Sequence, residues 1–316
     1  MTYRLDPSAD LHSTVLEVAE SQMGKLFDDL DDPPREEVLE SVHDARKRCK
    51  KIRALSRLVR PAIGDAYHRT NEAFRDAARE LSAIRDAQVL VETLDDLVSS
   101  APTALAPVRV DAARSEAVAR REQAGDRTLG VGGPMERARA LARLGRQHVA
   151  AWQVEDDEAV FEGLRKTYRR AVEARSRCTE EPTTGSFHEW RKRVKYHRHH
   201  LELLRDTEPA LVEPWAGRLH DLSDALGDDH DLSELVGTVT DDPDAFGGPE
   251  QADAIEVLAA GRSADLRSRA LALGARLTAE EPSAVSARLG TWWSAARDHG
   301  PSPQGTELSD LPDNSV

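Results

Sequence analysis

A cationic segment that occurs twice, at one fixed spacing, constrains the possible folds of this chain more than any other feature. The two copies are VHDARKRCKKIRALSRLVR at 42–60 and FHEWRKRVKYHRHHLELLR at 187–205, and they align without a gap at an offset of 145 residues, which places His43 on His188. The same offset pairs Asp86 with Asp231. A register that persists through helices and turns indicates that the two halves share one fold. We therefore predict an internal repeat with pseudo-twofold symmetry.

Composition and turn residues both favour helices. Aromatic residues make up 4% of the chain, whereas Ala, Leu, Arg, Asp and Glu are abundant, which is typical of packed helices rather than β-sandwiches. Segments rich in Pro, Gly and Asp separate the apolar-periodic stretches. We predict an all-α protein of two related antiparallel helical bundles. The expected helices lie near 9–29, 35–59, 64–84, 86–98, 107–124 and 135–152, and then near 155–178, 185–206, 210–226, 230–239, 250–279 and 283–299.

The predicted bundles divide the chain near residue 153. We assign 1–152 to the first repeat, 153–300 to the second, and the polar, Pro-rich 301–316 to a disordered tail. The sequence has no apolar run of the roughly 18 residues that a membrane helix needs, and its N-terminus lacks signal-peptide features. We expect a cytoplasmic protein with no membrane partner. Cys49 and Cys178 lack the spacing of a metal site, so we expect small core residues.

Positive charge is concentrated in the two copies of the repeated segment. The formal net charge of the chain is −14, yet 43–60 carries +7 and 188–205 carries +4, which leaves −25 on the remainder. An acidic surplus of this size repels polyanions when it is spread evenly over a surface. Its uneven distribution therefore points to a local anion site.

Helical periodicity places the cations of each copy on one face, which we call the cationic face. The cationic faces hold His43, Arg46, Lys47, Lys50, Arg53 and Arg57 in the first copy, and His188, Arg191, Lys192, Lys195 and Arg198 in the second. The opposite faces hold Val38, Val42, Ala45, Cys49, Ile52 and Val59, and Phe187, Trp190, Val194 and Leu204. A solvated helix face usually carries acids three or four residues from its bases, but Asp44 is the only acid between 43 and 60. Because stacked like charges destabilise a helix, an anion site competes strongly with the alternative of a solvated face.

Phosphate groups are the anions that suit these side chains. Arginine forks and lysine point charges both bind phosphate oxygens, and a long row of them fits an extended polyanion better than one compact nucleotide. His43 and His188 either contact the ligand or are satisfied at a helix seam. If they contact it, their protonation predicts tighter binding as the pH falls from about 8 to about 6.

The chain contains the motif H-x-x-R-K-x-x-K-x-x-R twice, and the segments LSAIRDAQVL and LGDDHDLSEL follow the first and the second copy. With these features the chain resembles the CHAD (conserved histidine α-helical domain) family over roughly residues 9–300. The resemblance implies two helical bundles with a basic central surface that binds inorganic polyphosphate. It implies ligand contacts from His43, Arg46, Lys47, Lys50, His188, Arg191, Lys192 and Lys195. The segment GLRKTYRRAVEAR at 163–175 looks like the family's basic helix and adds Arg165, Tyr168, Arg169 and Arg170. The matching segment of the first half, ESQMGK at 20–25, offers only Lys25, so we expect the two halves to grip the ligand unequally.

Enzyme and metal functions find less support. The chain lacks G-x-x-x-x-G-K-S/T, G-x-S-x-G and H-E-x-x-H motifs. GDDHD at 227–231 could hold Mg²⁺, but an aspartate that caps a helix before LSELV is the favoured interpretation. His197 and His200 could chelate a metal, yet the repeat aligns them with Ile52 and Leu55, which are core-like positions. The family often accompanies a triphosphate-tunnel enzyme domain with an E-x-E-x-K signature, which this sequence lacks.

We therefore predict a non-catalytic polyphosphate-binding protein that uses no cofactor and no metal. The alternatives are a module for single-stranded nucleic acid or for an acidic partner protein. We do not expect nucleic acid, because aromatic residues for base stacking are nearly absent from the basic segments. The expected partners are polyphosphate, in granules or free, and a separate enzyme that processes polyphosphate or triphosphate. The predicted binding residues are His43, Arg46, Lys47, Lys50, Lys51, Arg53, Arg57, Arg165, Tyr168, Arg169, His188, Arg191, Lys192, Lys195 and Arg198.

Overall fold

The computed structural model describes residues 3–100, 110–128 and 132–300, and the regular elements within those ranges are all helical. The all-α prediction is confirmed for this part of the chain, whereas the expected tail at 301–316 lies outside it. The first half contains α1 (Leu11–Asp29), a 3₁₀ turn (Arg35–Glu37), α2 (Val38–Leu58), α3 (Arg60–Ile63), α4 (Ala66–Glu80), α5 (Ser82–Ser100), α7 (Asp111–Thr128) and α8 (Pro134–Val149). The second half contains α9 (Asp157–Glu180), α10 (Thr184–Leu203), a 3₁₀ turn (Arg205–Thr207), α11 (Pro209–Asp241), α12 (Pro249–Leu277) and α13 (Pro282–His299).

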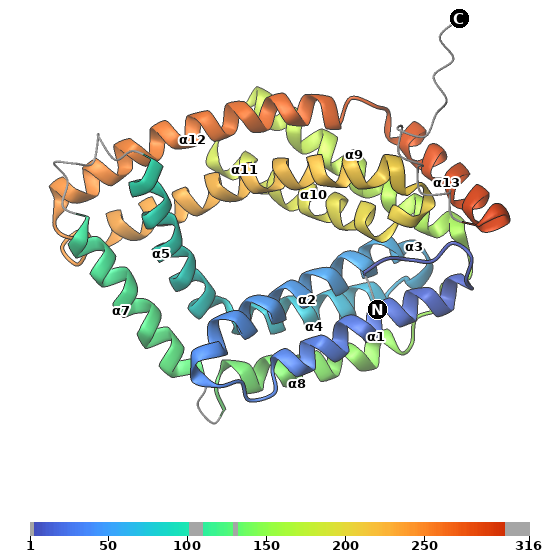
Figure 1. Ribbon diagram of the computed structural model, residues 1–316, viewed down its shortest axis with the longest axis horizontal. Helices are drawn as coiled ribbons and strands as arrows, with labels where there is room; N and C mark the ends of the chain where they lie inside the picture. Colours follow the sequence, from blue (N-terminus) through green and yellow to red (C-terminus); the bar gives the residue numbers. More distant parts are fainter. Residues whose placement is uncertain (1–2, 101–109, 129–131, 301–316) are drawn as a thin grey trace, which may run out of the picture.

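The helices form two layers, which α5 and α7 bridge at one end and which contact each other at the other end, where α2 and α3 meet α9 (Figure 1). Helices α1, α2, α4 and α8 pack together in one layer, and α9 to α12 form the other, with α13 packed on α9. Helices α5 and α7 pack against each other and cross between the layers, so that α5 contacts α2 as well as α11. Helices α2 and α10 also contact each other, and the two cationic segments therefore lie close together in space.

The repeated segments form α2 and α10, and each helix buries its apolar side as predicted. In α2, Val42, Cys49 and Ile52 are almost completely buried. In α10, Trp190 and Val194 are fully buried. Burial of apolar surface stabilises the folded state by about 25 cal/mol per Å². This burial fixes the orientation of each helix, so the cations on its other side point away from the core.

The predicted break at residues 227–229 is wrong, because α11 continues through it from Pro209 to Asp241. Asp229 does not cap a helix; its carboxylate is 2% exposed and accepts hydrogen bonds from Arg267 Nε at 2.7 Å and from Ser263 Oγ. These partners belong to α12, so the helix interior tolerates the aspartate through a contact between helices. The side chain of Arg267 also donates to Thr184 Oγ1 at 3.1 Å, which links α12 to the start of α10.

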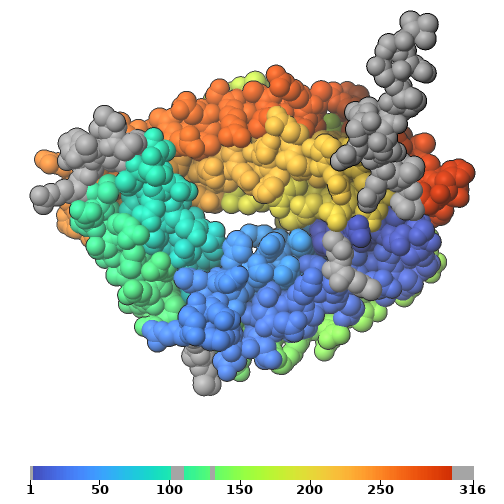
Figure 2. All heavy atoms as spheres, viewed as in Figure 1, coloured from blue at the N-terminus to red at the C-terminus, as the bar shows by residue number. Residues whose placement is uncertain are grey.

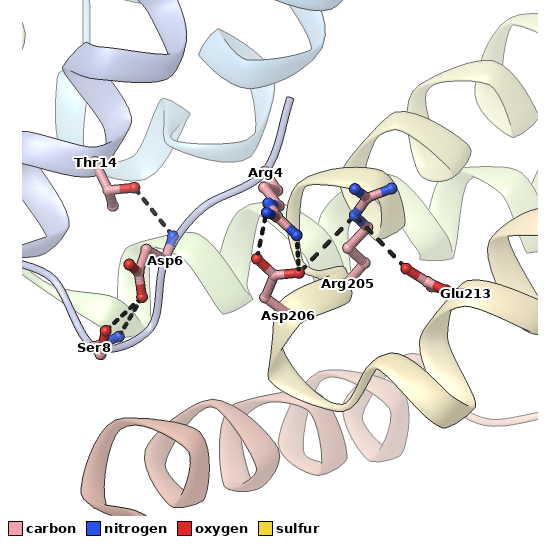
Figure 3. Close-up of polar contacts among 7 residues, drawn as sticks. All are labelled: Arg4, Asp6, Ser8, Thr14, Arg205, Asp206 and Glu213. Carbon is pink, nitrogen blue, oxygen red and sulfur yellow. Dashed lines mark hydrogen bonds and ion pairs between the residues drawn. The ribbon is translucent and has the colours of Figure 1, made fainter. Parts of the chain in front are cut away.

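The N-terminal segment ties the two layers together (Figure 3). The Leu5 amide donates to the Leu203 carbonyl at the end of α10, over 2.8 Å. Arg4 contacts both carboxylate oxygens of Asp206, each at 3.2 Å, and Arg205 lies 3.9 Å from the same carboxylate. The Asp6 amide donates to Thr14 Oγ1 in α1. One short segment thus connects α1 with the chain that follows α10.

Two further expectations concern single residues and membrane insertion. Cys49 and Cys178 are buried free thiols, as expected of small core residues. Burial raises the pKa of the Cys49 thiol to about 12, so this thiol stays protonated. Among the described helices, none combines the length and the apolarity required to span a membrane.

Candidate anion-binding site

A cavity of about 1020 Å³ lies between α2, α5, α7, α10 and α11. Figure 2 shows the hollow in the molecule between α2, α5 and the helices of the second layer. Both cationic faces contribute to its wall. The predicted binding residues that line it are His43, Arg46, Lys47, Lys50, Arg191, Lys195 and Arg198.

Each cationic helix contributes one arginine that is held by a carboxylate on a neighbouring helix. Arg46 Nη1 donates to the Ala78 carbonyl at 2.7 Å, and its other terminal nitrogen lies 3.9 Å from Asp86 at the start of α5. Arg191 likewise lies 3.9 Å from Asp231 of α11. At 3.9 Å these ion pairs are longer than a direct charge-assisted hydrogen bond of about 2.7–2.9 Å. Both guanidinium groups therefore keep donor capacity for a ligand in the cavity.

Lys50 and Lys195 carry the clearest electrostatic signature of the site. Burial, together with the positive charges of Arg46 and Arg191, lowers the pKa of Lys50 to about 8. Burial, Arg191 and Lys50 lower the pKa of Lys195 to about 7. Lys195 is less exposed than Lys50, which agrees with the larger shift in the pKa of Lys195. The two ammonium groups repel each other, and an anion between them would relieve that repulsion.

The histidines of the two motifs have lowered pKa values in the free protein. Burial and the nearby cations lower the pKa of His43 and of His188 from the ordinary value of 6.5. His188 Nδ1 lies 3.1 Å from Nδ1 of His230 in α11, whose pKa burial and Arg191 lower to about 3. In the free protein the rings of His43, His188 and His230 are therefore neutral above pH 6.5, whereas Lys195 titrates at about pH 7 and Lys50 at about pH 8.

Carboxylates of α5 and α11 also line the cavity. They are Asp86 of α5 and Asp224, Asp228, Asp231 and Glu234 of α11. Burial raises the pKa of Asp231, although Arg191 and Lys195 oppose the shift. The carboxylates partly neutralise the cations in the free protein, and they disfavour any anion that approaches the α11 side of the cavity.

The other predicted binding residues do not line the cavity. Lys51 lies over the Tyr3 ring at 4.6 Å, and Lys192 pairs with Glu189 at 2.5 Å. Arg53 donates to Asn71 and to Tyr196, at 3.1 and 3.2 Å. His188 contacts the wall through His230.

The predicted residues of α9 also lie away from the cavity. The Tyr168 side chain is fully buried, and its hydroxyl donates to the Glu280 carbonyl at 2.9 Å. Arg165 is exposed, and Arg169 is exposed and lies 3.8 Å from Glu173. Arg57 of α2 stacks on the Tyr196 ring at 4.0 Å. The structure thus brings seven of the predicted residues to one cavity and distributes the rest around its outside.

Two further arginines, Arg85 of α5 and Arg120 of α7, also line the cavity, although neither was predicted from the sequence as a binding residue. The repeat offset pairs Arg85 with His230, another lining residue, and this alignment could have identified both. No comparable signal marks Arg120, whose guanidinium lies 2.9 Å from Asp242 and 2.7 Å from Glu116. Its place in the wall depends on how α7 packs on α5.

The two candidate metal segments form no cluster of ligands. His197 and His200 are fully buried, and His200 Nε2 lies 3.0 Å from the Ala54 carbonyl oxygen, so the core-like interpretation is confirmed. Asp229 of GDDHD is bound to Arg267. Within residues 3–100, 110–128 and 132–300 there is no group of three or more His, Cys, Asp or Glu residues that could hold a metal ion.

Comparisons with known proteins place this chain in a family. The family model for the CHAD domain matches residues 20–240. The crystal structure of the CHAD domain from the plant Ricinus communis is similar, with a TM-score of 0.59 and 16% sequence identity over 95% of this chain and 96% of that chain. Identity at this level shows a shared fold, and a search of curated proteins found no match. Because the family model covers well over half of its residues, the chain belongs to the CHAD domain family.

Proposed function

We propose that this protein binds inorganic polyphosphate in the cavity between α2, α5, α10 and α11, and that it does so without catalysis. The observation that carries the proposal is the pair Lys50 and Lys195, which come from two helices and repel each other inside one cavity. Such an arrangement costs stability until an anion enters. Arg46 and Arg191 add donors beside the two lysines.

A linear, dense polyanion suits this cavity better than nucleic acid does. Phosphate contacts would be the same for both ligands. Sequence-tolerant binding of single strands, however, relies on aromatic rings that stack on bases. Among the described residues that line the cavity, none is Phe, Tyr or Trp. An acidic partner protein is also the weaker candidate. The cations lie between two helical layers, and a folded protein is too bulky to reach them there.

The internal repeat is part of the same proposal. The offset of 145 residues relates Arg46 to Arg191, Lys50 to Lys195, and Asp86 to Asp231. The two arginine–carboxylate distances are both 3.9 Å. We infer that residues 1–152 and 153–300 derive from one ancestral unit, and that a pseudo-twofold pair of cationic helices grips the polyphosphate chain from both sides.

A binding titration with charge reversal tests the function. Calorimetry would measure the affinity of the wild-type protein for long-chain polyphosphate, tripolyphosphate and poly-U. We expect selective binding of long-chain polyphosphate, and a loss on the order of 100-fold in the Lys50→Glu/Lys195→Glu variant, since hydrogen bonds to charged groups are worth about 1.5–3 kcal/mol each. The matched control is Lys166→Glu/Arg276→Glu, which reverses the same charge on exposed surface.

Two outcomes would contradict the proposal. Equal affinity for poly-U would move the protein to the nucleic-acid class. Unchanged affinity in the Lys50→Glu/Lys195→Glu variant would show that the cavity is not the site. If the site is correct, the biological setting we propose is the cytoplasm, where polyphosphate granules or a separate polyphosphate-processing enzyme would be the partners.

A further inference from the structure

Four arginines gather outside the cavity, where α2, α3, α9 and α10 meet. They are Arg57, Arg60, Arg170 and Arg193, and we call them the arginine cluster. Helix α9 contacts each of the other three helices. Burial and the charges of Arg193, Arg57 and Arg60 lower the pKa of Arg170, which indicates how close these groups lie to one another.

Two tyrosine rings orient two of the four guanidinium groups, those of Arg57 and Arg60. Arg57 Cζ lies 4.0 Å from the centre of the Tyr196 ring and 5.5 Å from that of Tyr67. Arg60 Cζ lies 4.5 Å from the centre of the Tyr67 ring. A guanidinium that stacks on an aromatic face keeps the N–H donors at its edge available. The rings thus orient Arg57 and Arg60 without accepting hydrogen bonds from them, and Arg60 Nη2 lies 3.4 Å from His68 Nε2.

One member of the cluster is paired with a carboxylate, since Arg193 contacts Glu189 of its own helix. Among the described residues, no Asp or Glu oxygen lies within 4.0 Å of a guanidinium nitrogen of Arg57, Arg60 or Arg170. Arg57 Nε is buried without a hydrogen-bond partner. Elsewhere in the chain, arginines such as Arg114 form direct ion pairs. Unneutralised arginines with oriented donors are a suitable site for phosphate oxygens.

The arginine cluster continues the cationic row that begins in the cavity. Along α2, Lys50 lines the cavity, Arg53 follows it, and Arg57 belongs to the cluster. At about 1.5 Å per residue, Arg57 lies roughly 10 Å beyond Lys50 along the helix axis. Arg53 contacts the hydroxyl of Tyr196, which adjoins the cavity residue Lys195 in sequence. A chain that leaves the cavity past Lys50 therefore meets Arg53 and then the cluster.

We propose that the arginine cluster is a second phosphate-binding site, which holds the part of a long polyphosphate chain that extends beyond the cavity. This inference rests on polyphosphate binding in the cavity. Two linked contacts raise the overall affinity without a change in either one. Long chains that reach both sites therefore bind more tightly than short chains that fill the cavity alone, and the cluster determines this preference for length.

The test compares long-chain polyphosphate with tripolyphosphate on the full chain. The variant Arg60→Gln/Arg170→Gln removes two charges from the cluster and leaves the cavity intact. The control Arg269→Gln/Arg276→Gln removes two exposed arginines of α12. We expect the cluster variant to lose at least tenfold in affinity for the long chain, since linked contacts contribute factors of about 10² or more, and less than about twofold for tripolyphosphate.

The outcomes separate this inference from the proposed function. An unchanged long-chain affinity in the cluster variant, or an equal loss for both ligands, would overturn the second site while cavity binding stands. Failure of the wild-type protein to bind either ligand would overturn the proposed function and this inference with it. The midpoint of thermal unfolding is measured for each variant. The variant Arg57→Lys keeps the positive charge but loses the planar guanidinium group and its paired N–H donors. It should also weaken binding of the long chain selectively.

Discussion

Polyphosphate affinity should depend on pH through two lysines of the cavity. In the free protein the pKa of Lys50 is about 8 and that of Lys195 about 7. A bound polyanion favours the charged forms and raises both values, so binding takes up protons. The affinity therefore increases as the pH falls from 8 to 6. His43 and His188 are neutral in the free protein over most of this range, because burial and the nearby cations lower their pKa values.

The size of the effect follows from the two pKa values. If both lysines are fully charged in the complex, protonation of Lys195 between pH 8 and pH 6 raises the affinity about tenfold, and Lys50 adds about twofold, which gives about 20-fold in total. Lys195 dominates because it is largely neutral at pH 8. It is also the less exposed of the two side chains.

Arginine replacements isolate the lysines, because arginine stays charged throughout this range. Calorimetric titrations at pH 6, 7 and 8, with one long-chain polyphosphate at constant ionic strength, should give the 20-fold change for the wild type. The Lys195→Arg variant should retain about twofold, and Lys50→Arg/Lys195→Arg should show a nearly flat profile. A flat wild-type profile would refute the reasoning. A slope that persists in the double variant would instead assign the proton uptake to His43 and His188.

Three further predictions concern salt and stability. The six Lys and Arg residues of α2 and α10 that line the cavity predict a slope near −4 for log affinity against log salt concentration, at about −0.7 per contact; a titration series with a slope shallower than about −1 would contradict a charge-driven site. Asp229→Asn should lower the free energy of unfolding by roughly 1.5–3 kcal/mol, measured in urea, because it weakens a buried bond to Arg267. Gly163→Ala should cost about 1–3 kcal/mol, because a Cβ atom there would overlap the Leu58 carbonyl oxygen where α9 meets α2; no change in the urea midpoint would contradict this packing.

The sequence predicted the cationic helices well because the signal is local. The periodicity that buries Cys49 and Trp190 also determines which residues of α2 and α10 face away from the core. The path of α11 could not be predicted in this way. Its Gly227–Asp229 segment carries a turn signal, and the partners that override it, Ser263 and Arg267, are 34 and 38 residues away from Asp229. The signal for a turn was real, but a contact between helices outweighed it.

The same distinction between local and distant interactions applies to the candidate site. Seven cavity residues follow from the repeated motif, since the motif specifies one helix face. The lowered pKa of Lys195 does not follow, because it depends on burial, on Arg191 of its own helix and on Lys50 of α2, while Asp231 of α11 opposes the shift. Tyr168 was expected beside the ligand, yet its ring contacts His197 at 5.0 Å between centres. Basic residues around a tyrosine do not reveal which side of the helix is buried.

The carboxylates of the cavity explain how the proposed polyanion site can fold without its ligand. Asp86 and Asp231 lie near enough to Arg46 and Arg191 to reduce the repulsion among the cations. Both pairs are nevertheless long, at 3.9 Å, so an incoming phosphate can take over the guanidinium donors without breaking a tight ion pair. Lys50 and Lys195 lack an ion pair with a described carboxylate, and their lowered pKa values reduce the charge of the empty cavity instead. The free protein thus limits its own repulsion in two ways, and both are reversed when an anion binds.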